Sequence, residues 1–309
     1  MTDDAEGPKV GQLDTAETAV VRSGRRQPTQ PDGSVEGYRA KRTLPVRVEL
    51  ARQLRRRRTR LALGFLAVLP FLLLLAFELG DDGGRRGRTL ADIATASGLN
   101  FAVFTLFAST NFLLVVVAAL FFGDTVASEA SWSSLRYLLA APIPRTRLLR
   151  QKAVVSALLS GFGLVLLSAV ALGVGLVWYG GGDLVSITGE TVPFPTGVVS
   201  LAAATVYLAV HLAWIAGLAL FLSVSTDAPL GAVGGAVVVS ILSEILDQIT
   251  ALGDLRNYLP THYSTAYSDL LGHDVDWTAM AHGAFSGLAY AAVFTALAIW
   301  RFNRKDITS

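Results

Sequence analysis

Residues 153–182 read AVVSALLSGFGLVLLSAVALGVGLVWYGGG, a stretch of 30 residues without Asp, Glu, Lys or Arg. A helix needs about 20 apolar residues to cross the ~30 Å hydrocarbon core of a bilayer, because each residue adds about 1.5 Å. Similar charge-free runs occupy residues 61–77, 93–123, 191–226, 228–243 and 277–300. The sequence therefore predicts an all-α membrane protein with six transmembrane helices, at 60–79, 100–122, 153–178, 197–222, 228–246 and 278–300.

The composition of the 309-residue chain also favours a membrane protein. Hydrophobic residues make up 52% of the chain and charged residues 16%, whereas about 25% of residues are charged in a typical soluble domain. A soluble fold would need amphipathic helices to cover six apolar ones, and the sequence has none left for that role. The chain has no cysteine, which excludes disulfides, thiolate metal sites and a cysteine nucleophile.

Lys and Arg lie mostly on one side of the predicted spans. Summed over alternate flanking segments, they number 22 on the side of both termini and 4 on the other side. Because cytoplasmic flanks are enriched in Lys and Arg, we expect both termini in the cytosol and a multi-pass protein of the plasma membrane. A cleaved signal peptide is not expected, since the first apolar run begins only at Leu61. The six-span domain is predicted over 59–305, with a short cytosolic tail at 306–309.

The segment before the first span divides into two parts. Residues 1–42 are polar and almost free of aromatics, which predicts a disordered cytosolic tail. Within 43–58, Val46, Leu50 and Leu54 recur at helical spacing and arginines fill much of the rest. This pattern predicts an amphipathic helix in the headgroup region, with arginines reaching anionic lipid. Alternatively, the arginines only mark the start of the first span.

The predicted cytosolic loop 123–152 has the sequence pattern of a helix and not that of a simple connecting loop. Asp124 suits a helix N-cap, and Pro142 suits the end of that helix. Between them an apolar stripe falls on one helical face, formed by Trp132, Leu135 and Leu139. An exposed stripe of this kind predicts a partner surface, unless it packs on the spans of the same chain or on the membrane.

This loop resembles the loop after the second span of ABC-2-type transporter permeases. That family carries an Ala-x-Glu, a Leu-Leu pair, a Pro-x-[Ser/Pro]-Arg and a Lys in this order. The matching residues are Ala127-Ser128-Glu129, Leu138-Leu139, Pro142-Ile143-Pro144-Arg145 and Lys152. The family often has Gly-Thr where this chain has Ser133-Ser134. The layout of 43–305 also fits the family, with six spans and a basic helix before the first.

The resemblance implies a permease subunit that forms the transmembrane pathway for export. Its loop helix would dock on a separate ATPase, which would bind ATP and Mg, and a second permease copy or a homologous permease would complete the pathway. The residues that this assigns to coupling are Glu129, Trp132, Leu135, Arg136, Leu139, Pro142 and Arg145. Glu129 and Arg136 lie seven positions apart and share a helical face, so we expect them to orient the helix. Short helices within Gln248–Asp276 would dip back into the membrane, and Gly231-x-x-x-Gly235 would lie at the subunit interface.

Catalytic motifs are absent from the sequence. A P-loop needs Gly before its Lys, but the four lysines follow Pro8, Ala40, Gln151 and Arg304. Neither His-Glu-x-x-His nor Gly-x-Ser-x-Gly occurs. We therefore expect no enzymatic activity, no cofactor in this chain and no nucleic-acid partner; membrane lipid surrounds it. A solvated loop is favoured over an external metal or proton site for His262, Asp269, His273, Asp274 and Asp276.

Two polar residues, Asn111 and His211, fall near the middle of predicted spans. Polar residues at this depth are candidates for lining a pathway, although an interhelical hydrogen bond would explain them equally. Two other functions remain open. A secondary transporter would need coupling carboxylates or broken helices at mid-depth, and a lipid-modifying membrane enzyme would need clustered acid and base groups at one interface.

Overall fold

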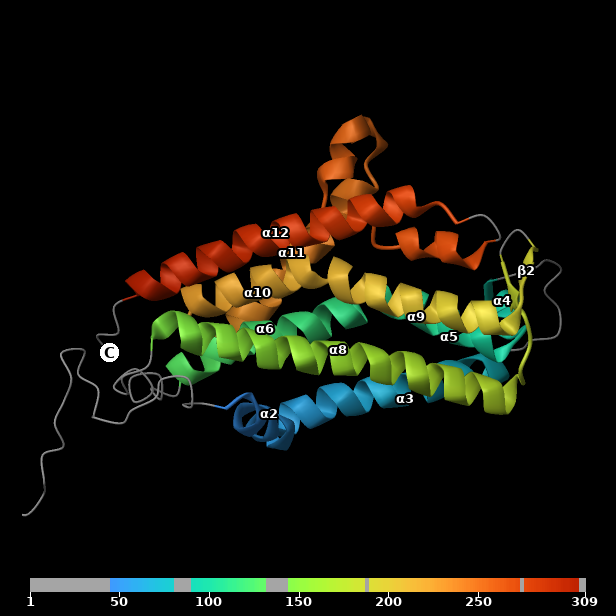
Figure 1. Cartoon of the computed structure of the whole chain (residues 1–309), viewed down its shortest axis with the longest axis horizontal. Coiled ribbons are helices and arrows are strands. Elements are labelled where there is room, and N and C mark those ends of the chain that lie inside the picture. Colours follow the sequence, from blue (N-terminus) through green and yellow to red (C-terminus); the bar gives the residue numbers. More distant parts are fainter. Residues whose placement is uncertain (1–44, 81–89, 132–143, 187–188, 273–274, 306–309) are drawn as a thin grey trace, which may run out of the picture. The chain divides into compact units, whose positions relative to one another are not determined.

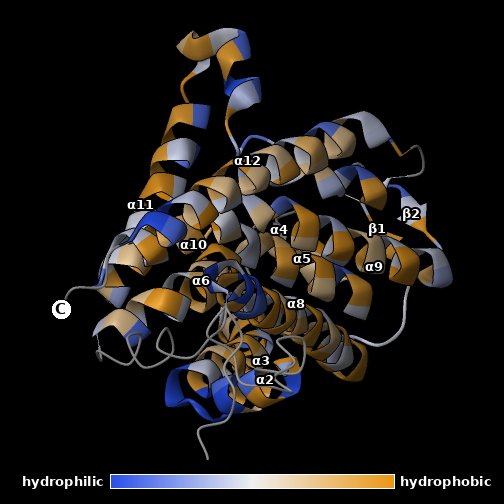
Figure 2. Ribbon diagram, turned by 60° about the vertical axis from the view of Figure 1, so that its left-hand side comes forward, coloured by the Kyte–Doolittle hydropathy of each residue, from blue (hydrophilic) through white to orange (hydrophobic). Residues whose placement is uncertain are grey.

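The computed structural model describes residues 45–80, 90–131, 144–186, 189–272 and 275–305. Among these, six helical segments are long and apolar enough to cross a membrane, which confirms the predicted number (Figure 1). They are α3 (Arg57–Leu79), α6 (Leu113–Ser131), α8 (Arg145–Trp178), α9 (Phe194–His211) with α10 (Ala213–Ser225), α11 (Pro229–Asp247) and α12 (Trp277–Arg304). Before them, α2 (Val46–Arg55) forms within the predicted amphipathic segment, and Figure 2 shows its hydrophilic residues beside the hydrophobic α3.

Two of the predicted spans are interrupted at their polar residues. The second consists of a short helix α5 (Gly98–Thr110), a break at Asn111, and then α6. Near its end, α5 carries three hydroxyls that bond to carbonyls four residues earlier, those of Thr105, Ser109 and Thr110. Such bonds compete with the backbone ladder and bend helices. The fourth span breaks similarly at Leu212, where α9 ends at His211 and α10 begins at Ala213.

The helix α6 continues to Ser131, well past the predicted end of the second span at 122. Asp124 consequently lies inside α6, and its prediction as the N-cap of a loop helix was wrong. The charge-free run stops at Asp124, but the helix continues, and Arg56 and Arg58 pair with this carboxylate.

Glycines allow the helices to approach closely, as in many membrane proteins. A Cβ added at Gly175 of α8 would lie 2.5 Å from the carbonyl oxygen of Gly98 on α5. A Cβ added at Gly287 of α12 would lie 2.8 Å from the carbonyl oxygen of His211. The buried apolar side chains form two clusters, one mainly from α5, α8 and α9 and one mainly from α6, α10 and α12.

The two ends of the bundle carry different elements. One end, named here the α2 end, holds α2 with the last turns of α6 and α12 and the first turn of α8; it lies at the left of Figure 1. The other, the hairpin end, holds α4 (Leu90–Ala94) and the antiparallel strands β1 (Leu184–Val185) and β2 (Thr191–Val192). Asn100 joins this hairpin to α5, because its side chain bonds to both the carbonyl and the amide of Val185.

Between α11 and α12 the chain forms two 3₁₀ helices, η2 (Thr250–Tyr258) and η3 (Ala266–Leu271). Tyr267 of η3 is 1% exposed, and its hydroxyl lies 3.3 Å from that of Thr110 at the end of α5. The Tyr207 hydroxyl donates to the carbonyl of Tyr263 at 2.5 Å. The short helices that the resemblance implied for Gln248–Asp276 are therefore present, and η3 packs against α9 and α12.

Candidate coupling site and membrane pathway

A buried ion pair joins α6 to α8 on either side of residues 132–143. The Lys152 Nζ lies 2.6 Å from the Glu129 Oε1, and the two side chains are only 3% and 5% exposed. Glu129 is near the end of α6 and Lys152 near the start of α8, so the pair holds together the two helix ends between which the predicted coupling loop lies. A buried pair of this kind is stable only while both partners are present.

The amphipathic helix α2 is bonded to the same pair. Arg52 lies 2.7 Å from Glu129 and 2.9 Å from Glu49, and Lys152 lies 3.7 Å from Glu49. Burial raises the pKa of Glu49, but Lys152 and Arg52 outweigh burial and hold this pKa below the usual 4.5. These four residues, Glu49, Arg52, Glu129 and Lys152, are named here the ion-pair cluster.

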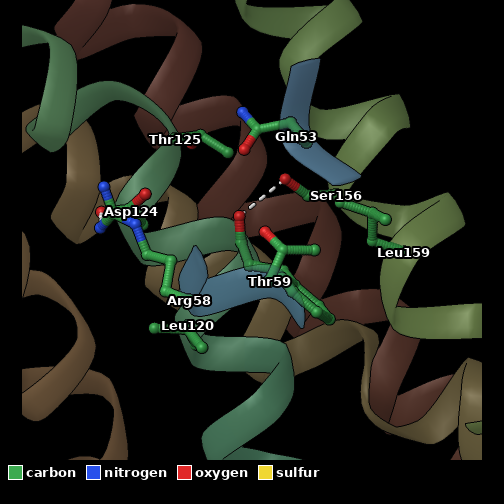
Figure 3. A pocket seen from close by; sticks show the side chains of 9 residues that line it. Gln53, Arg58, Thr59, Leu120, Asp124, Thr125, Ser156 and Leu159 are labelled. Carbon is green, nitrogen blue, oxygen red and sulfur yellow. Dashed lines mark hydrogen bonds and ion pairs between the residues drawn. The ribbon is translucent and has the colours of Figure 1, made fainter. Parts of the chain in front are cut away.

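A second contact lies one turn further into the bundle. Asp124 of α6 pairs with Arg58 and, at 3.3 Å, with Arg56. A cavity of about 10 Å³ adjoins it (Figure 3), about enough space for one water molecule. Its polar lining comes from Gln53, Arg58, Thr59, Asp124, Thr125 and Ser156. Three of the arginines that the sequence assigned to lipid, those at 52, 56 and 58, are thus directed at carboxylates of α2 and α6.

Arg145, a predicted coupling residue, caps the last helix. Its Nη1 donates to the carbonyls of Phe302 at 3.4 Å, Asn303 at 3.3 Å and Lys305 at 2.9 Å. A cation is favourable at this negative end of the helix dipole. Lys305 in turn bonds to the Val224 carbonyl of α10 at 3.1 Å and to Asp227 at 2.6 Å. The first turn of α8 and the end of α12 are therefore tied together.

Most of the predicted coupling stripe falls outside the described residues. Trp132, Leu135, Arg136, Leu139 and Pro142 lie within 132–143, and their contact surface stays a prediction. The structure does place Glu129 and Arg145, which flank that segment. The sequence analysis did not predict that Glu49 and Asp124 form ion pairs. A carboxylate beside an apolar run gives the same sequence pattern whether it pairs with a distant arginine or faces water.

The structure does not bring the two mid-span candidates together among its described contacts. Asn111 is exposed at the break between α5 and α6. His211 is 2% exposed and stacks on Tyr207, with ring centroids 5.6 Å apart and an interplanar angle of 16°. Gly287 of α12 packs directly on its backbone, so His211 lies where α9 meets α12. Its role in lining a pathway stays a prediction.

The polar groups of the loop between α11 and α12 serve as anchors. The His262 Nδ1 lies 2.5 Å from the Asp247 Oδ1, and the hydroxyls of Ser243 and Thr261 are 2.6 Å apart. Within the described part of the chain, no group of three or more His, Asp or Glu side chains is arranged to hold a metal ion. His273 and Asp274 lie outside that part.

Comparison with protein families gives a match over nearly the whole membrane domain. The model of the "ABC-2 family transporter protein" family matches residues 47–307. This range contains α2, the ion-pair cluster and all six spans. A search of curated proteins gives no match.

Proposed function

Because the chain belongs to the ABC-2 family of transporter proteins, whose members are membrane permeases of ABC transporters, we propose that it exports its substrate with energy from a separate ATPase subunit. The excess of Lys and Arg near the α2 end, 22 against 4, supports a cytosolic position for this end. The ATPase, carrying ATP and Mg, would then meet the permease at residues 132–143. In this proposal the protein lies in the plasma membrane with both termini inside.

The ion-pair cluster is the observation that carries the proposal. Glu129 and Lys152 flank the coupling loop, so a force applied to that loop reaches α6 and α8 together. Removing one partner of a buried ion pair lowers stability by about 3–5 kcal/mol. A pair of this strength would keep the ends of α6 and α8 joined while they move. Arg52 adds α2 to the same moving unit. In this proposal Trp132, Leu135 and Leu139 contact the ATPase, and Arg136, Pro142 and Arg145 fix the geometry of the loop.

A second permease subunit would complete the pathway. Within its own chain, Gly235 lies against Leu222 of α10, because an added Cβ would be 3.3 Å from that side chain. Gly231 is exposed, so the face of the Gly231-x-x-x-Gly235 motif remains available for the subunit interface. Val238 and Leu242 lie seven residues after Gly231 and Gly235 and share their helical face. With Ile245 they form an exposed stripe on α11, and we assign this stripe to the contact with a second permease.

The test is the double variant Leu135→Ala/Leu139→Ala, with Leu79→Ala/Leu255→Ala as its matched control. Leu79 and Leu255 are exposed leucines that lie outside the loop. Burying each coupling leucine should contribute about 1.5–3 kcal/mol, so the loop variant should copurify with the ATPase at least about 100-fold less well. Expression and six-span topology should not change in either variant. A loop variant that is degraded while its ATPase still binds would show that the stripe packs inside the permease.

One observation also favours a second candidate function. The breaks at Asn111 and Leu212 are the broken helices that a secondary transporter uses at mid-depth. Reconstitution of the purified chain alone decides between the two: uptake into liposomes without ATP or an ATPase would support secondary transport and contradict the permease role.

A further inference from the structure

An apolar groove of about 140 Å³ runs between three helical segments beside both helix breaks. Its floor is one face of α6, formed by Leu114, Val117 and Phe122. Its walls are small residues on facing stripes, Ala157 and Gly161 of α8 and Ala209, Ala213 and Ala216 of α9–α10. A Cβ added at Gly161 would meet no atom within 4 Å. Small residues on facing helices usually permit close packing, whereas these stripes stay apart.

The position of the groove indicates what can fill it. From Ala157 to Leu164 its wall on α8 is about 10 Å long, which suits a narrow, extended ligand. An apolar cavity of about 150 Å³ in another protein accepts benzene, so a groove of this size accommodates roughly six carbon atoms. It lies near the middle of α8, and its lining side chains include one polar residue, Ser160, and no charged one, so water would find few hydrogen-bond partners there. A gap left open would lose the dispersion contacts of its walls, and an alkyl chain supplies them.

A cation marks one end of the groove. Arg150 lies seven residues before Ala157 on α8, which places it on the same helical face about 10 Å toward the α2 end. Arg150 is exposed, whereas the neighbouring Lys152 is buried in the ion-pair cluster and Arg145 caps α12. A guanidinium recognises phosphate through two parallel hydrogen bonds.

We propose that this groove and Arg150 together bind one anionic phospholipid of the bilayer, with an alkyl chain against Gly161 and the phosphate on Arg150. The chain then lies between α8 and α9–α10 and touches Leu114 and Leu212 at the two helix breaks. Binding of the lipid does not depend on the ATPase. Only the choice of the cytosolic leaflet rests on the proposed function.

The experiment uses the purified chain in phosphatidylcholine nanodiscs that contain a phosphatidylglycerol with a diazirine at mid-chain. Photolysis should attach this lipid to peptides of α6, α8 and α9–α10. In Gly161→Leu the new side chain occupies the groove, and cross-linking there should fall about tenfold or more. The matched control is Gly173→Leu on the same helix, where an added Cβ also meets no atom within 4 Å; its cross-linking should match the unaltered protein. If Gly161→Leu fails to insert, Ala213→Leu tests the opposite wall.

The headgroup contact is tested separately. Arg150→Gln should lower cross-linking of phosphatidylglycerol about fivefold, to the yield of a matching diazirine phosphatidylcholine. Arg301→Gln is the control, because Arg301 is also exposed at the α2 end, on α12. Equal cross-linking of Gly161→Leu and the unaltered protein would overturn the groove, and cross-links between two chains through these residues would identify a second copy as its occupant. An unchanged yield in Arg150→Gln would overturn the anionic headgroup.

Discussion

At the α2 end, opposite charges meet at 2.6 Å between Lys152 and Glu129, whereas near the hairpin end Gly175 and Gly98 bring two backbones into direct contact. The first contact is electrostatic and sensitive to protonation. The second is steric and insensitive to solution conditions. If the proposed ATPase acts at the α2 end, this difference matters, because the charged end would respond to the partner while the glycine contacts keep the helices in register.

The largest expected effect comes from breaking the buried charge pair. Lys152→Met leaves Glu129 and Glu49 without this cation and should lower the free energy of unfolding by about 3–5 kcal/mol. Lys305→Met is the matched control: Lys305 lies at the same 2.6 Å from Asp227, but that carboxylate is 66% exposed, so the loss should be about 1 kcal/mol or less. Unfolding in mixed detergent micelles measures both. Equal losses would mean that burial does not distinguish the two pairs.

The steric contact predicts a smaller but clear effect. In Gly175→Ala the added methyl group would overlap the Gly98 backbone, and such overpacking costs about 1–3 kcal/mol. Gly173→Ala on the same helix places its methyl group in open space and should gain up to about 1 kcal/mol from helix propensity. Thermal unfolding of the two variants measures the difference. A Gly175→Ala protein as stable as Gly173→Ala would contradict the close packing of α5 on α8.

The smallest expected effect is a pH dependence confined to the α2 end. The pKa of Glu49 is held below 4.5 in the folded protein, so its contribution is complete above pH 4.5 and is lost as the pH falls through the lowered value. A spin label at Ala51→Cys, in a chain without cysteine, should gain mobility in that acid range. The transition should disappear in Glu49→Gln. The mobility of a label on α12, at Asn303→Cys, should not change in the pH range where Glu49 becomes protonated.

The same comparison explains which parts of the fold could be predicted from the sequence. Six charge-free runs were enough to predict six spans, because a bilayer requires long apolar helices whatever their neighbours. The end of α6 could not be predicted in this way, since Asp124 pairs with arginines 66 and 68 residues earlier in the chain, and such distant contacts leave no local signal. The break at Asn111 had a local signal in the hydroxyls of Thr105, Ser109 and Thr110 before it.

The candidate site was predictable only in part. The motif residues Glu129, Arg145 and Lys152 were identified by resemblance, but their contacts with Arg52 and the α12 carbonyls depend on tertiary packing. His211 was predicted at mid-span from its position, but its packing against Gly287 depends on tertiary structure. No periodicity in the sequence contains that information.

The bond between Glu129 and Lys152 has a further consequence for the chain that it closes. The two residues are 23 positions apart, and bringing the ends of a free segment of that length together costs roughly 3 kcal/mol of chain entropy. In this protein the cost is met when the permease folds, before any ATPase arrives. A docking partner then encounters a loop whose end-to-end distance is already fixed, so more of its contact energy remains as net affinity.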